Sequence, residues 1–253
     1  ADVTGIDLPT GSAIAWASSP CTDLSLAGNR DGLAGRQSGT FWHFVRILDE
    51  LGDARPPVAV LENVTGLASS HSGDDLTAAV RAFNSLGYSV DALAIDARHF
   101  IPQSRPRMFL VGALTPPNSD NSPSELRPEW LEWIHSDPTL TTHRAPLPIV
   151  PPLLTQGFTA LADQLPDDDP HWWNPSRTAD FLRSLSPVQA ARLESLRASN
   201  QVSYRTAYRR TRQGKPVWEI RPDDIAGCLR TARGGSSRQA VVKAGEDKVA
   251  VRW

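Results

Sequence analysis

Several residue types that dominate disulfide-rich, metal-binding or membrane proteins are scarce in this chain. Its 253 residues include only two cysteines, Cys21 and Cys228, which are too few for a disulfide scaffold or a four-cysteine zinc site. No apolar run approaches the roughly 18 residues that span a bilayer, and no signal-peptide pattern opens the chain. No internal repeat is present either. These absences predict a soluble globular protein of a reducing compartment, and we expect a cytoplasmic location.

Positive charge is unevenly distributed along the chain. The net charge is only −2, yet residues 177–238 hold 13 Lys and Arg against 5 Asp and Glu. The rest of the chain holds 13 basic against 23 acidic residues. A local excess of eight positive charges predicts contact with a polyanion such as a nucleic acid. The alternative is an arginine-rich helix surface that is simply solvated.

A short apolar run leads directly to the first cysteine. Residues 13–17 predict a buried strand, and Ser18-Ser19-Pro20 ends it just before Cys21. Open α/β sheets place their chemistry at the carboxyl ends of their strands, so Cys21 is a candidate nucleophile. The alternative is a small buried hydrophobic side chain, which is the usual state of a free cysteine. The glycine-bearing polar stretch 27–39 that follows predicts a functional loop.

The next hundred residues alternate between helix and strand patterns. A strand, a helix and a second strand in succession imply a crossover connection between parallel strands, and hence an α/β fold. Glu62 and Asn63 follow the second strand, so we expect them at the same sheet edge as Cys21. The predicted elements are a helix over 41–51, a strand over 58–61, a helix from 74 to about 86, and strands over 88–95 and 108–111.

Three polar side chains alternate in the segment before the last of these strands. In extended chain Gln103, Arg105 and Arg107 point to one face, and Pro102 and Pro106 keep the backbone extended. A surface salt-bridge ladder is one interpretation. The other combines this face with the sheet edge described above: a thiol, a carboxylic acid and two cations suit thiolate addition to an electron-poor ring.

These residues form three motifs that resemble those of one known family. Pro20-Cys21, Glu62-Asn63-Val64 and Gln103-Ser104-Arg105-Pro106-Arg107 are similar, in order and spacing, to motifs of the cytosine-5 DNA methyltransferases. The resemblance covers residues 1–113. It implies a partial Rossmann-like methyltransferase sheet with helices on both faces, plus a second, smaller target-recognition domain. We therefore expect a catalytic portion over 1–114, and a linker with the recognition domain over 115–253.

The resemblance also implies a role for each motif residue. Cys21 would add to carbon 6 of a cytosine flipped out of double-stranded DNA, and Glu62 would hydrogen-bond ring nitrogen 3. Arg107 would contact the carbonyl oxygen of the base, while Arg105 would order the pocket and the Glu62 carboxylate. Asn63 is expected to shape the turn rather than to react.

The second half of the chain is expected to recognise the DNA. Nine prolines in residues 116–152 predict a connecting region, and a helix is predicted over about 187–198. Cys228 is expected to be a packing residue. Trp172 and Trp173 could stack on DNA, although tryptophan pairs are more often core anchors. The residues expected to contact DNA are Ser25, Arg230, Arg233 and Arg238.

The cofactor implied by the resemblance is S-adenosylmethionine. Asp2 would touch its adenine, but the family's glycine-rich cofactor loop would precede residue 1 and a further helical motif would follow Trp253. We therefore expect an incomplete cofactor site and little activity from this chain alone. Further chain segments or a second subunit would then carry the cofactor motifs. Two alternatives stay open: a DNA-recognition subunit without its own catalysis, and an RNA cytosine-5 methyltransferase.

Overall fold

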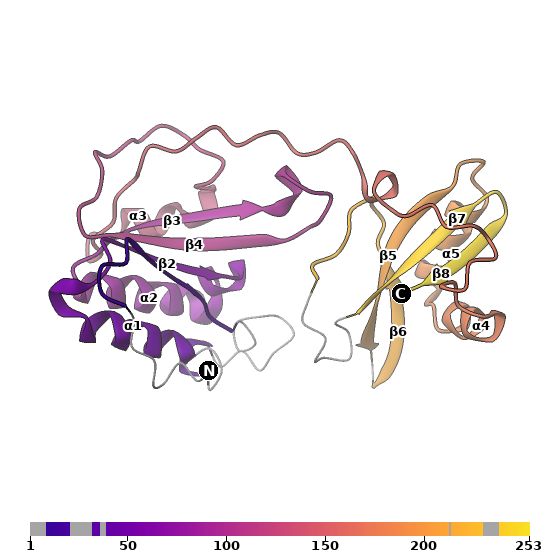
Figure 1. Cartoon of the computed structure of the whole chain (residues 1–253), viewed down its shortest axis with the longest axis horizontal. Helices are drawn as coiled ribbons and strands as arrows, with labels where there is room; N and C mark the ends of the chain where they lie inside the picture. Colours follow the sequence, from indigo (N-terminus) through magenta and orange to yellow (C-terminus); the bar gives the residue numbers. More distant parts are fainter. Residues whose placement is uncertain (1–8, 21–31, 36–38, 213, 230–237) are drawn as a thin grey trace. The chain divides into compact units, whose positions relative to one another are not determined.

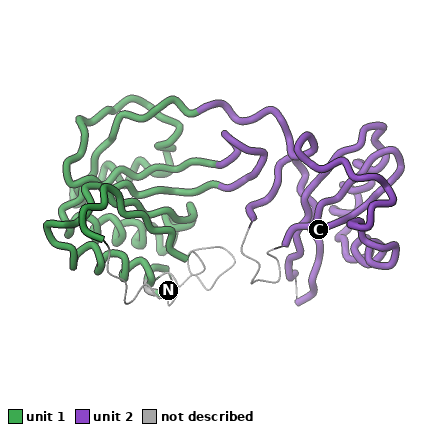
Figure 2. The backbone as a smooth tube through the Cα atoms, viewed as in Figure 1, with its two compact units in different colours: residues 1–96, 106–150 green, residues 97–105, 151–253 purple. Residues whose placement is uncertain are grey.

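The structure is a computed structural model that describes residues 9–20, 32–35, 39–212, 214–229 and 238–253. The chain divides into two compact units: unit 1 comprises residues 1–96 and 106–150, and unit 2 comprises 97–105 and 151–253 (Figure 2). The assignment of catalysis to residues 1–114 and of recognition to 115–253 concerns function and stays a prediction. Within the described part of the chain, every helix is too short or too polar to cross a membrane.

Unit 1 contains a four-stranded mixed sheet in the order β1-β2-β4-β3 (Figure 1). The parallel pairing predicted for the first two strands is confirmed, with Ser18 opposite Glu62 at their carboxyl ends. The other two strand pairs of this sheet are antiparallel, because β4 runs opposite to both β2 and β3. The strands are β1 (Ile14–Ser18), β2 (Val58–Asn63), β3 (Ser89–Asp96) and β4 (Pro106–Ala113).

Helices α1 (Thr40–Glu50) and α2 (Asp74–Ser85) pack on one face of this sheet (Figure 1). Leu61 of β2 and Leu110 of β4 are opposite each other and fully buried in the resulting core. Position 112 requires glycine, because a Cβ there would lie 2.7 Å from the ring of Phe83 in α2. Since both long helices lie on this face, helices on the opposite face stay a prediction.

The prediction of a buried first strand is wrong for alternate residues of β1. Ala15 is buried, but Ile14 and Trp16 are 58% and 59% exposed. Side chains alternate between the two faces of a strand, so these two point away from the face that α1 and α2 cover. The Trp16 ring makes an edge contact with Phe109, at 5.9 Å between ring centroids.

The proline-rich segment after β4 is more than a connection. Its backbone follows β3: Val90 N–H donates to the carbonyl of Thr141, His143 N–H donates to the carbonyl of Val90, and Ala94 N–H donates to the carbonyl of Leu126. The segment also contains α3 (Glu132–Ser136), whose Ile134 is fully buried. Prolines lack an N–H group, but the residues between them supply the donors and acceptors that an exposed strand edge requires.

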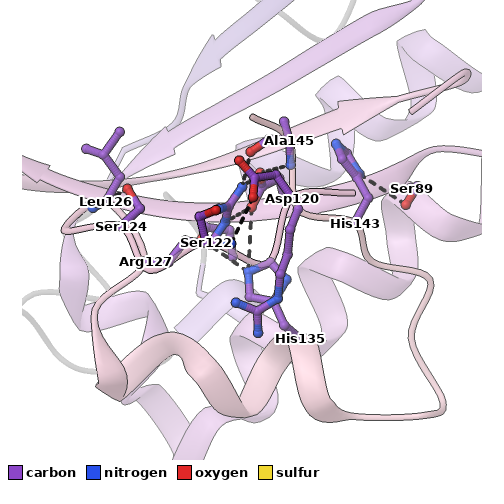
Figure 3. Close-up of polar contacts among 12 residues, drawn as sticks. Ser89, Asp120, Ser122, Ser124, Leu126, Arg127, His135, His143 and Ala145 are labelled. Carbon is purple, nitrogen blue, oxygen red and sulfur yellow. Dashed lines mark hydrogen bonds and ion pairs between the residues drawn. The ribbon is translucent and has the colours of Figure 1, made fainter. Parts of the chain in front are cut away.

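A buried ionic cluster fastens this segment to β3 (Figure 3). The Asp91 carboxylate accepts two hydrogen bonds from the Arg127 guanidinium, at 3.0 and 2.6 Å, and one from Ala145 N–H at 3.0 Å. His135 Nε2 lies 3.6 Å from the same carboxylate. Burial lowers the pKa of His135 and of nearby His143, since a dry environment disfavours the charged imidazolium.

Unit 2 is built on a second four-stranded sheet, all antiparallel, in the order β6-β5-β7-β8. Its core joins this sheet to two helices that begin with a capping residue and proline, Asn174-Pro175 and Ser186-Pro187. Trp173 packs against this core, and its ring centroid lies 5.1 Å from that of Trp253. This position agrees with the core-anchor interpretation. The elements are α4 (Pro175–Arg183), α5 (Pro187–Arg197), β5 (Ser203–Arg212), β6 (Lys215–Ile220), β7 (Gln239–Gly245) and β8 (Lys248–Arg252).

Candidate active site

The carboxyl ends of β1 and β2 lie side by side in unit 1. Ser18 pairs with Glu62, and the chain continues from Ser18 through Ser19 and Pro20 to Cys21. Cys21 itself lies outside the described residues. Parallel pairing in this register places Ser18, three residues before Cys21 in the sequence, at the same sheet edge as Glu62, the last residue but one of β2.

Glu62 and Arg107 form an ion pair at this edge. Arg107 Nε lies 2.8 Å from Glu62 Oε1, and each side chain is 17% exposed. The pair forms because β4 runs antiparallel beside β2, which brings the residue before Met108 next to the end of β2. A guanidinium at this distance fixes the orientation of the carboxylate and donates a charge-assisted hydrogen bond. Two of the four predicted catalytic residues are thus in direct contact.

Asn63 connects the two strand ends. It is 2% exposed, its side-chain amide donates to Ser19 Oγ at 2.9 Å, and its side-chain oxygen accepts from Val64 N–H at 2.8 Å. The bond to its neighbour Val64 agrees with the expected turn-shaping role. The bond to Ser19 was not foreseen from the sequence, where the two residues are 44 positions apart.

A second buried carboxylate holds the turn at Gly32–Ala34. Asp75 of α2 accepts a 3.1 Å hydrogen bond from Leu33 N–H and contacts His71 Nδ1 at 2.9 Å. Burial raises the pKa of Asp75, but hydrogen bonds from Ser70, His71 and Leu33 N–H outweigh it, so the pKa lies below its usual value. Trp42 Nε1 donates to the Leu33 carbonyl at 3.1 Å. These contacts hold the described residues 32–35 of the long loop that precedes α1.

Arg105 has described contacts within unit 2. Its Nη1 donates to Cys228 Sγ at 3.1 Å and to the Leu229 carbonyl at 3.4 Å. The predicted catalytic role of Arg105, which involved ordering the Glu62 carboxylate, stays a prediction. Cys228 is partly buried and contacts a guanidinium, a contact that the sequence did not reveal.

The remaining predicted residues lie mostly outside the described part of the chain. Asp2, Ser25, Arg230 and Arg233 are among them. Arg238 is described, and its guanidinium stacks over the ring of Trp253, 4.6 Å from the centroid. Among the described residues, no group of three or more His, Cys, Asp or Glu side chains could hold a metal ion.

Comparison with known proteins identifies the family to which this arrangement belongs. The family model for C-5 cytosine-specific DNA methylase matches residues 2–217, which include all three motifs. The chain belongs to the C-5 cytosine-specific DNA methylase family. The resemblance carried by the Cys21, Glu62 and Arg107 motifs is thereby confirmed.

Individual members of this methylase family match the chain over shorter stretches. The Type II methyltransferase M.MspI of Moraxella sp is 36% identical over 117 residues, which cover 45% of this chain and 27% of that protein. The DNA-cytosine methyltransferase of Escherichia coli strain K12 is 37% identical over 111 residues, covering 37% of this chain and 23% of that protein. The chain spans about a quarter of the length of these curated relatives.

Solved structures of methyltransferases also overlay on the chain. The crystal structure of S. pombe Dnmt2 methyltransferase matches with a TM-score of 0.43 at 15% sequence identity. The overlay covers 74% of this chain and 52% of that one. An Entamoeba histolytica methyltransferase, EhMeth, gives the same TM-score and identity over 72% of this chain and 45% of that one.

Proposed function

We propose that the chain carries the catalytic residues and the recognition domain of a DNA cytosine-5 methyltransferase that acts through a covalent Cys21 adduct. The observation that carries the proposal is the Glu62–Arg107 ion pair, 2.8 Å long, at the sheet edge where β1 ends, three residues before Cys21 in the sequence. Family membership gives the reaction class, and this pair gives two of its residues a common location.

The proposed chemistry assigns each step to residues of this chain. The Cys21 thiolate forms a bond to carbon 6 of the cytosine ring, and the electron pair of the 5,6 double bond moves to carbon 5. Glu62 shares a proton with ring nitrogen 3, and Arg107 donates to the base carbonyl oxygen, so both stabilise charge that develops on the ring. S-adenosylmethionine, when bound, supplies the methyl group. Solvent water then accepts the proton of carbon 5, the electron pair of that C–H bond restores the 5,6 double bond, and the Cys21–carbon 6 bond breaks with its electron pair returning to the sulfur as thiolate.

The fixed carboxylate orientation is what suits this pair to the reaction. Preorganised donors and acceptors stabilise a transition state without reorganising as charge appears. Because Glu62 and Arg107 are both mostly buried, their interaction is screened less than a surface pair would be. A flipped base presented to this edge would meet both groups on one side of its ring.

The methyl donor in the proposed reaction is S-adenosylmethionine. Asp2, the one residue expected to touch S-adenosylmethionine, lies outside the described residues, so no described residue is assigned to the cofactor. The basic character of residues 177–238 supports DNA as the substrate, because phosphate contacts supply most of the affinity.

Covalent trapping tests the function directly. Duplex DNA with 5-fluorocytosine in place of cytosine is incubated with the protein, S-adenosylmethionine and any completing subunit, and the products are analysed by mass spectrometry. We expect an adduct on Cys21 that Cys21→Ser abolishes and Cys228→Ser retains. DNA binding without an adduct would instead support the recognition module, and an adduct with RNA alone would support the RNA enzyme.

A further inference from the structure

The loop between β3 and β4 belongs to unit 2, although both strands belong to unit 1. Its backbone pairs with a short segment of unit 2: Ala226 N–H donates to the Pro102 carbonyl at 2.7 Å, and Ser104 N–H donates to the Ala226 carbonyl at 2.9 Å. Gln103 and Ala226 thereby form a parallel bridge. Farther back in the loop, Leu154 N–H donates to the Arg98 carbonyl.

Arg105 extends this pairing with its side chain. Its guanidinium contacts the Cys228 sulfur at 3.1 Å and the Leu229 carbonyl at 3.4 Å. Hydrogen bonds from a charged donor are stronger than neutral ones, so the side chain adds to the two backbone bonds. The loop residues 102–105 and the segment 226–229 are therefore joined by four hydrogen bonds in sequence order.

The same segment is held from its other side by the sheet of unit 2. Gly227 N–H donates to Thr206 Oγ1 of β5 at 3.2 Å, and Gln239 Nε2 of β7 donates to the carbonyls of Gly227 and Cys228 at 3.0 and 3.1 Å. A Cβ at residue 227 would lie 2.9 Å from Gln239 Oε1, so glycine lets the Gln239 amide approach the backbone closely. Segment 226–229 is thus clamped between the loop and the sheet.

We propose that Arg105 is a positioning residue that fixes segment 226–229 for DNA contact. Leu229 directly precedes Arg230 in the sequence, and Gln239 directly follows Arg238, so the clamp holds both neighbours of the predicted DNA-contacting stretch. Arg105 and Arg107 belong to one motif but then have different roles. Arg105 contacts segment 226–229, whereas Arg107 pairs with Glu62 within unit 1. This inference rests on the proposed function for its DNA step, but its structural step is independent of it.

Amide hydrogen exchange of the whole chain tests the structural step. We expect Arg105→Ala to speed exchange about tenfold in peptides covering both 102–105 and 226–229, the loss appropriate to one or two charge-assisted bonds. Cys228→Ala should cause a smaller increase in the same two peptides, and Arg105→Lys should restore part of the protection. Exchange in β2 and β5 should stay unchanged. Unaltered exchange at 226–229 in Arg105→Ala would overturn the proposal.

Adduct formation with 5-fluorocytosine DNA, measured against DNA concentration, tests the DNA step. We expect Arg105→Ala to raise the half-saturating DNA concentration about tenfold, with a smaller loss of rate at saturation. Arg107→Ala should show the reverse pattern. If Arg105→Ala lowers the saturating rate as Arg107→Ala does and leaves half-saturation unmoved, the positioning role is wrong. Failure of the unsubstituted protein to form any adduct would reject the proposed function instead. Hydrogen exchange would still show whether Arg105 holds segment 226–229.

Discussion

The side-chain amide of Asn63 donates a 2.9 Å hydrogen bond to Ser19 Oγ. This bond joins the ends of β1 and β2 one residue beyond their last paired positions, Ser18 and Glu62. Ser19 lies two residues before Cys21, and Asn63 directly follows Glu62, so one buried side chain bridges the two motif strands. The motif asparagine therefore acts as a structural link between the predicted nucleophile and the predicted acid.

We expect Asn63→Ala to lower the unfolding free energy by about 1–3 kcal/mol, because it leaves buried polar groups without partners. The rate of adduct formation should also fall. Urea unfolding and adduct kinetics measure the two effects. Ser19→Ala removes only the acceptor and serves as the matched control. In a double-mutant cycle the two substitutions should be non-additive; strictly additive effects would show that the bond contributes nothing.

Glu62→Gln should separate catalysis from stability. We expect the rate of adduct formation to fall by about 10²- to 10⁴-fold, the usual contribution of a positioned acid, because the amide cannot share its proton with the base in the same way. The free energy of unfolding should fall by only about 1–2 kcal/mol, because the amide keeps the shape of the side chain and an oxygen that accepts from Arg107, while the attraction between the two charges is lost.

Glu50→Gln provides the control for this substitution. Glu50 forms an exposed ion pair with Arg46 on α1, so its loss should affect neither rate nor stability. If Glu62→Gln retained the full rate of adduct formation, the assignment of Glu62 to the reaction would be wrong.

Much of unit 1 could be predicted from local sequence. The helices at 40–50 and 74–85 and the strands at 58–63, 89–96 and 106–113 fall where apolar spacing placed them, to within a few residues. Local patterns carry this information because side-chain period reflects secondary structure directly. The same period could not show that β1 exposes Trp16, because burial of a strand face depends on what packs against it.

Contacts between residues far apart in the chain could not be predicted from the sequence. The bond between Asn63 and Ser19 and the contact between Arg105 and Cys228 join residues far apart in the chain, and neither leaves a local pattern. One signal was available. Asp91 stands within an otherwise apolar strand, and a carboxylate there requires a cationic partner. The partner, Arg127, is in the proline-rich segment, which its prolines made easy to mistake for a mere connection.

Breaking the Asp91–Arg127 pair should destabilise unit 1 strongly. Both side chains are almost fully buried, so Asp91→Ala would leave a guanidinium without its counter-ion, at a cost of about 3–5 kcal/mol. Thermal or urea unfolding measures the change. Glu132→Ala is the matched control in the same segment. Its pair with Arg144 is more exposed, so we expect a loss of about 1 kcal/mol or less. Equal effects of the two substitutions would show that the buried Asp91–Arg127 pair stabilises unit 1 no more than the exposed pair does.

The same cluster makes the stability of unit 1 dependent on pH. Burial lowers the pKa of His135 and His143, so both imidazoles stay neutral in the folded protein at a pH where the unfolded chain, with a histidine pKa of about 6.5, binds protons. The groups around them are the carboxylates of Asp91 and Glu132 and the guanidinium groups of Arg127 and Arg144. Because the unfolded state binds more protons, stability falls as pH drops below about 6.5.

Urea unfolding at several pH values between 5 and 7.5 measures this dependence. Each histidine should contribute at most about 1.4 kcal/mol per pH unit to the slope of the unfolding free energy against pH. His143→Gln should remove the contribution of His143. Asp75 has a lowered pKa, so its contribution is lost only below about pH 4, outside this range. A flat stability profile from pH 7.5 to 5 would show that the two imidazoles accept protons in the folded state as readily as in the unfolded chain.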